Sequence, residues 1–116
     1  MAGDPKRVIA YVKADALARA VLAAGKSWPS QERGLYNFLR ERSLRLPGII
    51  MAGVAAGERR EDAQRFFSEA LIAACEAEYA AAAAVSTVAG DAVKKAHEAS
   101  SEAREAIQDH LAAMNL

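Results

Sequence analysis

Apolar residues recur along most of the chain at the spacing of three and four positions that marks amphipathic helices. The first such segment extends from about Pro5, which follows Asp4, to about Ala24, and Gly25 is expected to stop it. Its expected inward stripe comprises Ala10, Ala14, Leu17, Val21 and Ala24. The pattern therefore predicts one long helix near the start of the sequence.

A second helix is predicted after the connection KSWPSQE, with Pro29 at its opening. Leu35, Phe38 and Leu39 have the spacing of inward positions on this helix. The helix then meets the stretch LPGIIMAGVAAG, residues 46–57, which contains one proline and three glycines and has no charged residue. Such a stretch has three physical interpretations: a phosphate-binding loop, a membrane segment or a closely packed part of a helical core.

Two of these interpretations fail on the residues themselves. Gly48 and Gly53 have the spacing of a phosphate-binding loop, but Val54 and Ala55 stand where that loop needs a lysine and a serine or threonine. Twelve uncharged residues are also too few to span a bilayer, which takes about 20. We therefore expect the second helix to continue through this stretch, kinked near Pro47, with both glycines allowing close approach to the third helix.

The third predicted helix runs from about Glu61 to Val88. Its expected inward stripe comprises Ala63, Phe66, Ala70, Ala73, Ala77, Ala80 and Ala84, flanked by Phe67, Ala74 and Ala81. The segment YAAAAAVSTV, residues 79–88, carries no charge, and a helix that is apolar all round must be covered all round. Because one side of every helix in so small a bundle faces out, we expect another subunit to cover it. The expected interface residues are Tyr79, Ala82, Ala83 and Val85.

Gly90 and Asp91 mark a turn and the start of a fourth helix. Its expected inward stripe comprises Val93, Ala96, Ser100, Ala103, Ile107, His110 and Met114. Four amphipathic helices with short connections are typical of an all-α, up-down-up-down antiparallel four-helix bundle. At 116 residues the chain is expected to form one domain, residues 1–116, that needs no disulfide or metal to hold it together.

The net charge of zero hides two unlike halves. Residues 1–57 carry nine Lys or Arg against four Asp or Glu, whereas residues 58–116 carry six against eleven. The front half is therefore plus five and the back half minus five, which suits a head-to-tail contact between subunits that repeats until a ring closes. The N-terminal segment has no apolar stretch of the kind found in secretory signals, so we expect a cytoplasmic protein.

The residues that could carry chemistry are few. Di-iron bundles need Glu-x-x-His motifs, but Lys94 and Ile107 stand three positions before His97 and His110. We expect no catalytic residue, no metal and no cofactor, and therefore no enzyme. The single cysteine, Cys75, has apolar neighbours and is expected to be a small core residue.

Four arginines on the second helix are the best binding candidates: Arg33, Arg40, Arg42 and Arg45. The first two are seven positions apart and share a face, and the other two share a neighbouring one. Arginines can hold phosphates by bidentate contacts, so this helix is a candidate nucleic-acid site. They can equally keep an outer helix face soluble, pair with acidic residues across a subunit boundary, or bind a protein partner.

Several segments resemble a known family. LARAV, WPSQERGLYNFLR, LPGII and RFFSEALIAACEAEY are similar, between about residues 8 and 90, to the four-helix-bundle family of proteins encoded in intervening sequences of bacterial large-subunit ribosomal RNA. That family includes the accessory protein of diversity-generating retroelements. Where it usually has an asparagine and a glutamate after the proline of the second helix, this chain has Ile49 and Ala52.

The resemblance implies a homopentameric ring, and its retroelement branch implies contact with nucleic acid and a reverse transcriptase. Together with the residue pattern, it leads us to expect a non-enzymatic, homo-oligomeric scaffold or adaptor outside the membrane. The alternative is an accessory protein that binds nucleic acid, or a nucleic-acid enzyme, through the arginines of the second helix.

Overall fold

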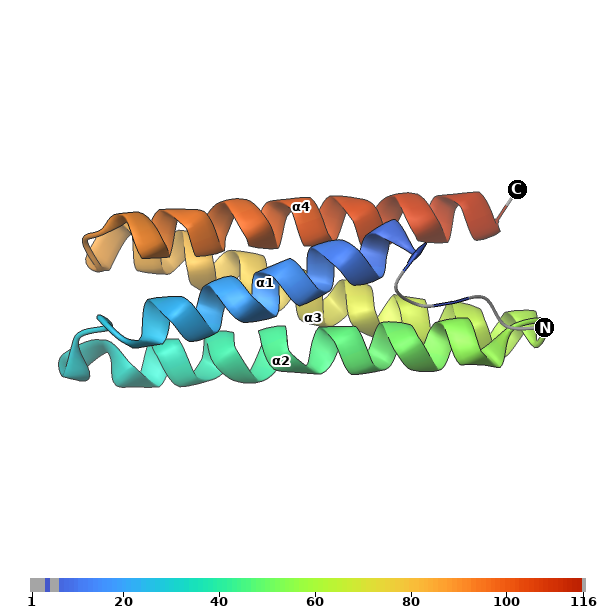
Figure 1. The fold of residues 1–116 in the computed structure, drawn as a ribbon, viewed down its shortest axis with the longest axis horizontal. Coiled ribbons are helices and arrows are strands. Elements are labelled where there is room, and N and C mark those ends of the chain that lie inside the picture. Colours follow the sequence, from blue (N-terminus) through green and yellow to red (C-terminus); the bar gives the residue numbers. More distant parts are fainter. Residues whose placement is uncertain (1–3, 5–6, 116) are drawn as a thin grey trace.

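Four long α-helices account for most of the chain in the computed structural model, which describes residue 4 and residues 7–115. Their bounds are α1 Ile9–Gly25, α2 Arg33–Ala56, α3 Arg60–Thr87 and α4 Asp91–Met114, and a short 3-10 helix, η2 Ser30–Glu32, precedes α2. The described residues contain no strand. Figure 1 shows the helices lying along one axis, in a body of 46 × 20 × 19 Å. The prediction of an all-α fold with four helices is confirmed.

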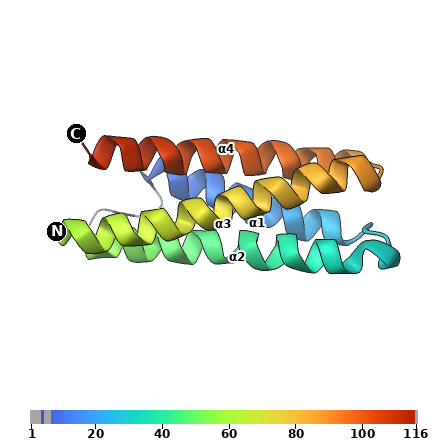
Figure 2. The same ribbon diagram turned by 180° about the vertical axis from the view of Figure 1, so that it is seen from behind.

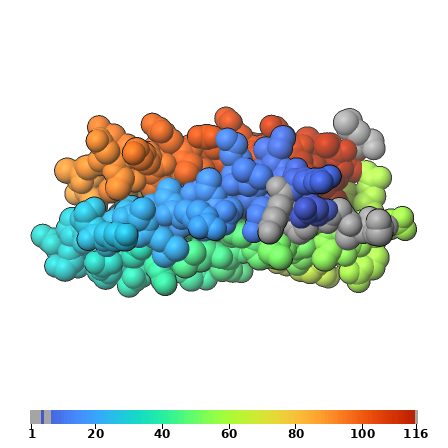
Figure 3. Space-filling view, viewed as in Figure 1, coloured from blue at the N-terminus to red at the C-terminus, as the bar shows by residue number. Residues whose placement is uncertain are grey.

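The four helices pack around a square, so that each contacts two others. α1 packs against α2 and α4, α3 packs against the same two helices, and within the described residues no contact joins α1 to α3 or α2 to α4. α1 and α3 therefore occupy diagonally opposite corners, as the two ribbon views in Figures 1 and 2 show. In the space-filling view of Figure 3, α1 covers the middle of one face between α2 and α4. The sequence colours in Figure 1 run in opposite directions along consecutive helices.

Aromatic packing fixes the connection between α1 and α2. The Trp28 indole is buried, donates from Nε1 to the Glu32 carbonyl at 3.0 Å, and has its ring 5.1 Å from that of Tyr36. The Tyr36 hydroxyl donates to the Val21 carbonyl in α1 at 3.3 Å. A Cβ on Gly25 would lie 2.1 Å from that hydroxyl, so only glycine leaves room for the tyrosine at this position.

Two helices begin later than predicted. The predicted start of α1, Pro5, lies outside the described residues, and the helix begins at Ile9 because Val8 has extended backbone (φ −80°, ψ 124°). Pro29 is also extended (φ −61°, ψ 140°) and caps the 3-10 turn, so α2 begins at Arg33. The starts of α3 and α4 agree with the prediction to within one residue.

The glycine-containing stretch of residues 46–57 is helical up to Ala56 and packs in the core, as predicted. α2 continues without a break through Pro47. A Cβ on Gly53 would lie 2.7 Å from Cε2 of Phe67, so the close approach of α2 to α3 is confirmed there. The predicted close approach is wrong at Gly48, which is exposed; an added Cβ there would meet no atom within 4 Å. Among the described residues, no helix has the length and apolar character needed to cross a bilayer.

The core follows the predicted stripes, except that Leu35 is only half-buried and two aromatic positions differ. Phe38 was expected to point inward but is 38% exposed, and Tyr36 is the buried aromatic of α2 instead, because Gly25 makes room for it. On α3, Phe66 is only half-buried, while its neighbour Phe67 is 1% exposed. Phe67 takes the central position because it faces Gly53 across the interface between α2 and α3.

Cys75 is exposed, so the prediction that it is a core residue is wrong. It lies three positions from Ile72 and four from Tyr79, and these spacings place all three on one side of α3. That side points away from the alanines that fill the bundle. The predicted stripe of α4 is buried from Val93 to Ile107, whereas its last two members, His110 and Met114, are half-buried.

Candidate functional site

The outer side of α3 exposes large apolar side chains in the single subunit. Tyr79 is 78% exposed, Ile72 63% and Val85 38%. Ala82 is also exposed and Ala83 is half-buried. All four residues expected at an interface from sequence therefore reach the surface of this helix. Residues 72–85 extend for about 20 Å along it. We call this surface the α3 face; it comprises Ile72, Cys75, Tyr79, Ala82, Ala83 and Val85.

The sequence analysis did not place Ile72 and Cys75 on this face, although their helical spacing from Tyr79 indicates it. Ile72 precedes Tyr79 by seven positions, two full helical turns, and so belongs to the same face. The expectation covered only the charge-free segment that begins at Tyr79. Glu76 and Glu78 lie between Ile72 and Tyr79 in the sequence, so the apolar surface was not seen to extend back to Ile72. Those glutamates lie on the two margins of the α3 face and leave its centre apolar.

Each margin of the α3 face is formed by an ion pair with a neighbouring helix. On the α2 side, Nε of Arg42 lies 3.2 Å from Oε1 of Glu76. On the α4 side, Nε of Arg104 lies 3.0 Å from Oε1 of Glu78. The hydrogen bond from Arg104 lowers the pKa of Glu78 against the opposing effect of partial burial. Both carboxylates are therefore satisfied within the subunit, and the surface between them is uncharged.

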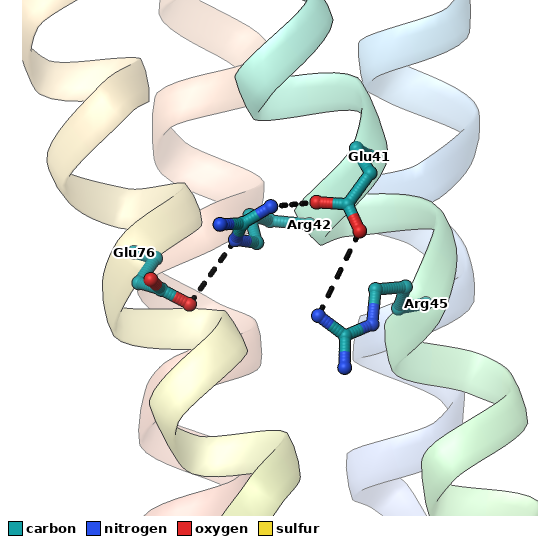
Figure 4. Close-up of polar contacts among 4 residues, drawn as sticks. All are labelled: Glu41, Arg42, Arg45 and Glu76. Atoms are coloured by element: carbon teal, nitrogen blue, oxygen red, sulfur yellow. Dashed lines mark hydrogen bonds and ion pairs between the residues drawn. The ribbon is translucent and has the colours of Figure 1, made fainter.

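Two of the four candidate arginines are engaged with carboxylates, as Figure 4 shows. Arg42 pairs with Glu41 as well as with Glu76, and its guanidinium carbon lies 4.4 Å from the centre of the Phe38 ring. Arg45 places Nη1 3.7 Å from Oε1 of Glu41. Two arginines and two glutamates make this cluster neutral, so it offers little net attraction for a phosphate backbone.

The other two candidate arginines lie on a different side of α2. Tyr36, which bonds to α1, stands three positions after Arg33 and four before Arg40, so these arginines flank the edge of α2 next to α1. Arg33 donates from Nη2 to the Trp28 carbonyl at 3.4 Å and lies over the Tyr36 ring. Arg40 is exposed, and no ion pair or hydrogen bond of its side chain is found within the described residues. The four arginines thus do not form one patch.

A second apolar surface, which the sequence interpretation did not identify, lies on the outer side of α1. Ile9 is 68% exposed and Val12 50%, and Ala16 and Ala23 are exposed on the same side. Their spacings of three, four and seven are those of one helix face, so the signal was present in the sequence. It was overlooked because the inward stripe of α1 alone explained its amphipathic pattern. We call this surface the α1 face; it comprises Ile9, Val12, Ala16 and Ala23. The exposed Arg19, three positions after Ala16 and paired with Asp15 at 2.9 Å, lies on the same side and interrupts it.

A shallow pocket opens where α1 and α4 meet near the N-terminal end of α1. Its volume is about 400 Å³, and its lining comprises Arg7, Val8, Ile9, Ala10, Ala106, Asp109 and His110. His110 stacks on Phe67 with the ring centres 4.0 Å apart, and burial lowers the pKa of the imidazole. The ring therefore acts chiefly as part of the core. In residue 4 and residues 7–115, no group of three or more His, Cys, Asp or Glu residues is placed to hold a metal ion.

Comparisons of the chain with protein-family models, curated proteins and solved structures found no match. The resemblance to the intervening-sequence family consequently rests on the residue motifs alone. In the structure, the two positions where the chain departs from that family, Ile49 and Ala52, are half-buried on α2.

Proposed function

We propose that this chain is an up-down-up-down four-helix bundle, with α2 bent near Pro47, that assembles with copies of itself into a ring and serves as a non-enzymatic scaffold or adaptor. The opposite running directions of consecutive helices support the topology. The number of subunits, five, comes from the resemblance to the intervening-sequence family. The expected location is the cytoplasm.

The observation that carries self-assembly is the exposure of the α3 face. Two large apolar side chains seven positions apart on one side of α3, Ile72 and Tyr79, are open to solvent, and Val85 at the margin and the small residues beside them add further apolar area. Contiguous apolar patches of more than a few hundred Å² on a soluble protein usually mark an interaction site. Burial of such a patch gains about 25 cal/mol per Å² of apolar area removed from water. A second copy of the chain can provide that burial.

Light scattering on the peak that elutes from a sizing column tests the assembly. We expect a mass of five times the subunit mass of 12.3 kDa at micromolar concentration. A monomeric mass would overturn the proposal, whereas another discrete oligomer would overturn only the number taken from the family resemblance.

Nucleic-acid binding through α2 is the alternative function, and Arg40 is the observation that favours it. Its exposed guanidinium has no partner among the described residues, and Arg33 is nearby on the same side of the helix. The test is an electrophoretic shift with mixed RNA and DNA at about 50 mM salt, where phosphate contacts are strong. This function would be established if the wild-type protein shifts the nucleic acids and Arg40→Ala weakens that shift equally for all nucleic-acid sequences. The absence of a shift with wild type would exclude it.

A further inference from the structure

Four cationic side chains gather on the outer surface where α1 and α2 lie side by side. α1 contributes Arg19 and, directly after its last residue and still with helical backbone, Lys26; α2 contributes Arg33 and Arg40. All four are exposed. The two cations of each helix are seven positions apart, two full turns, and therefore share one side of it. We call this the α1–α2 cationic surface; it comprises Arg19, Lys26, Arg33 and Arg40.

The rows from the two helices lie side by side. α1 and α2 are in contact and run in opposite directions (Figure 1). Tyr36 is level with the last turn of α1, because its hydroxyl bonds to the Val21 carbonyl and would meet a Cβ on Gly25. Arg40 is one turn further along α2, and Arg19 is about one turn earlier on α1. These two arginines are therefore level with each other, on either side of the boundary between the helices.

The connection between the helices holds the other two cations at one end of this surface. Lys26 begins the connection and Arg33 follows it. Arg33 donates from Nη2 to the Trp28 carbonyl at 3.4 Å, and its guanidinium carbon lies 5.1 Å from the centre of the Tyr36 ring. Trp28 is buried and donates to the Glu32 carbonyl. The packed aromatic side chains thus fix where the guanidinium of Arg33 lies.

The cations of this surface outnumber the carboxylates beside them. Residues 14–40 carry four Lys or Arg and two acids, Asp15 and Glu32. Asp15 lies 2.9 Å from Nε of Arg19 and so orients its side chain. The other three cations have no ion pair among the described residues. This surface differs in that respect from the neutral cluster of Arg42, Arg45 and two glutamates on the other side of α2.

The chemistry of the surface favours phosphate groups over bases and lipids as its ligand. Arginines bind phosphate through paired, charge-assisted hydrogen bonds. Proteins that bind single-stranded nucleic acid stack its bases on exposed aromatic rings, but Trp28 and Tyr36 are buried. Helices that lie in a membrane surface have a broad apolar face, whereas the large apolar side chain exposed between the two rows, Leu22, is 44% exposed and surrounded by cations.

We infer that the α1–α2 cationic surface binds the phosphate backbone of double-stranded nucleic acid, without reading the base sequence. The inference rests on the alternative function, nucleic-acid binding, and extends it from α2 to α1. Arg19 and Lys26 of α1 supply half of the contacts, so Arg40 acts as one of four cations. Contacts to the backbone position a protein on a duplex and carry no sequence information.

The test removes one charge at a time from different places. Electrophoretic shifts with duplex DNA and duplex RNA of mixed sequence, over a series of salt concentrations, give the affinity and its salt slope. Arg19→Gln, Lys26→Gln and Arg40→Gln should each weaken binding and reduce the slope by about one. The double variant Arg19→Gln/Lys26→Gln leaves α2 untouched and should reduce the slope by about two.

Arg65→Gln is the matched control. Arg65 is exposed on α3, at the corner of the bundle diagonally opposite α1, so this variant removes the same charge from a distant place. It should bind as wild type does. Light scattering on every variant confirms that the number of subunits is unchanged, because repeated copies of a site raise the apparent affinity.

The outcomes separate the inference from the function on which it rests. Weakening by Arg40→Gln with wild-type binding by the double α1 variant would overturn the inference and leave binding through α2 intact. Equal weakening by Arg65→Gln would also overturn it, since the attraction would then come from the overall charge. Tighter binding to a single strand than to the duplex would refute the choice of ligand. So would binding to vesicles of anionic phospholipid without binding to duplex. No shift of any nucleic acid by wild type would exclude the function and the inference together.

Discussion

Substitution of Gly53 by alanine tests the contact that brings α2 and α3 together. The added Cβ would lie 2.7 Å from Cε2 and 2.9 Å from Cδ2 of Phe67, and 3.3 Å from Cβ of Phe66. Distances under 3.0 Å require movement, and the Phe67 ring has little freedom because it is 1% exposed and stacked on His110. Overpacking of this kind costs about 1 to 3 kcal/mol. Replacing a glycine inside a helix by alanine stabilises the folded state by about 1 kcal/mol, which offsets part of that cost.

Gly48 is the matched control on the same helix. It is exposed, and a Cβ there has no neighbour within 4 Å, so Gly48→Ala should show the helix-propensity gain alone, about 1 kcal/mol. Gly53→Ala should then be less stable than Gly48→Ala by about 1 to 3 kcal/mol. Urea unfolding followed by circular dichroism, at one protein concentration, measures the difference, because assembly makes stability depend on concentration. Equal stabilisation by the two substitutions would refute the close contact at Gly53.

Three further substitutions test other parts of the structure. Ala82→Glu is expected to release folded monomers on a sizing column, whereas Gln108→Glu leaves the assembly intact, because only the first adds a charge to the α3 face. Ser43→Ala should raise the urea midpoint more than Ser100→Ala, since the Ser43 hydroxyl is buried without a partner among the described residues, whereas Ser100 donates to a carbonyl. The advantage of wild type over Glu78→Gln should shrink as the pH falls below 4.5, because the pKa of Glu78 is lowered in the folded state.

The fold was predictable because helical periodicity is a local property of the sequence. The inward stripe of α1 could be read from spacing alone, and Ala10 through Ala24 in that stripe are all buried. Neighbouring residues were harder to distinguish, since adjacent positions differ by only about 100° around the helix. Phe66 and Phe67 both fit an inward face, and only the space left by Gly53 on another helix decides between them.

The candidate sites were less predictable because they depend on which helix lies beside which. The four arginines of α2 looked like one basic cluster along the sequence, yet Arg42 and Arg45 are engaged with Glu41 and Glu76. Glu76 belongs to α3, and its proximity follows from tertiary packing alone. The α1 face was overlooked because the inward stripe of α1 alone explained the amphipathic pattern of that helix, and exposure of a residue such as Ile9 depends on where the neighbouring helices lie.

In a ring of subunits, the outer sides of α2 and α4 would be repeated once per subunit, and the two helices occupy diagonally opposite corners of the bundle. These two outer sides differ in charge. α2 would present exposed Arg40 once per subunit, whereas α4 would present the exposed carboxylates of Glu98, Glu105 and Asp109 beside two lysines. Repetition around a ring raises the strength of a weak contact through multivalency. One exposed arginine binds an acidic partner weakly in a single subunit, but its repeated copies in an assembled ring would act together. The nucleic-acid test is therefore informative only on the assembled protein.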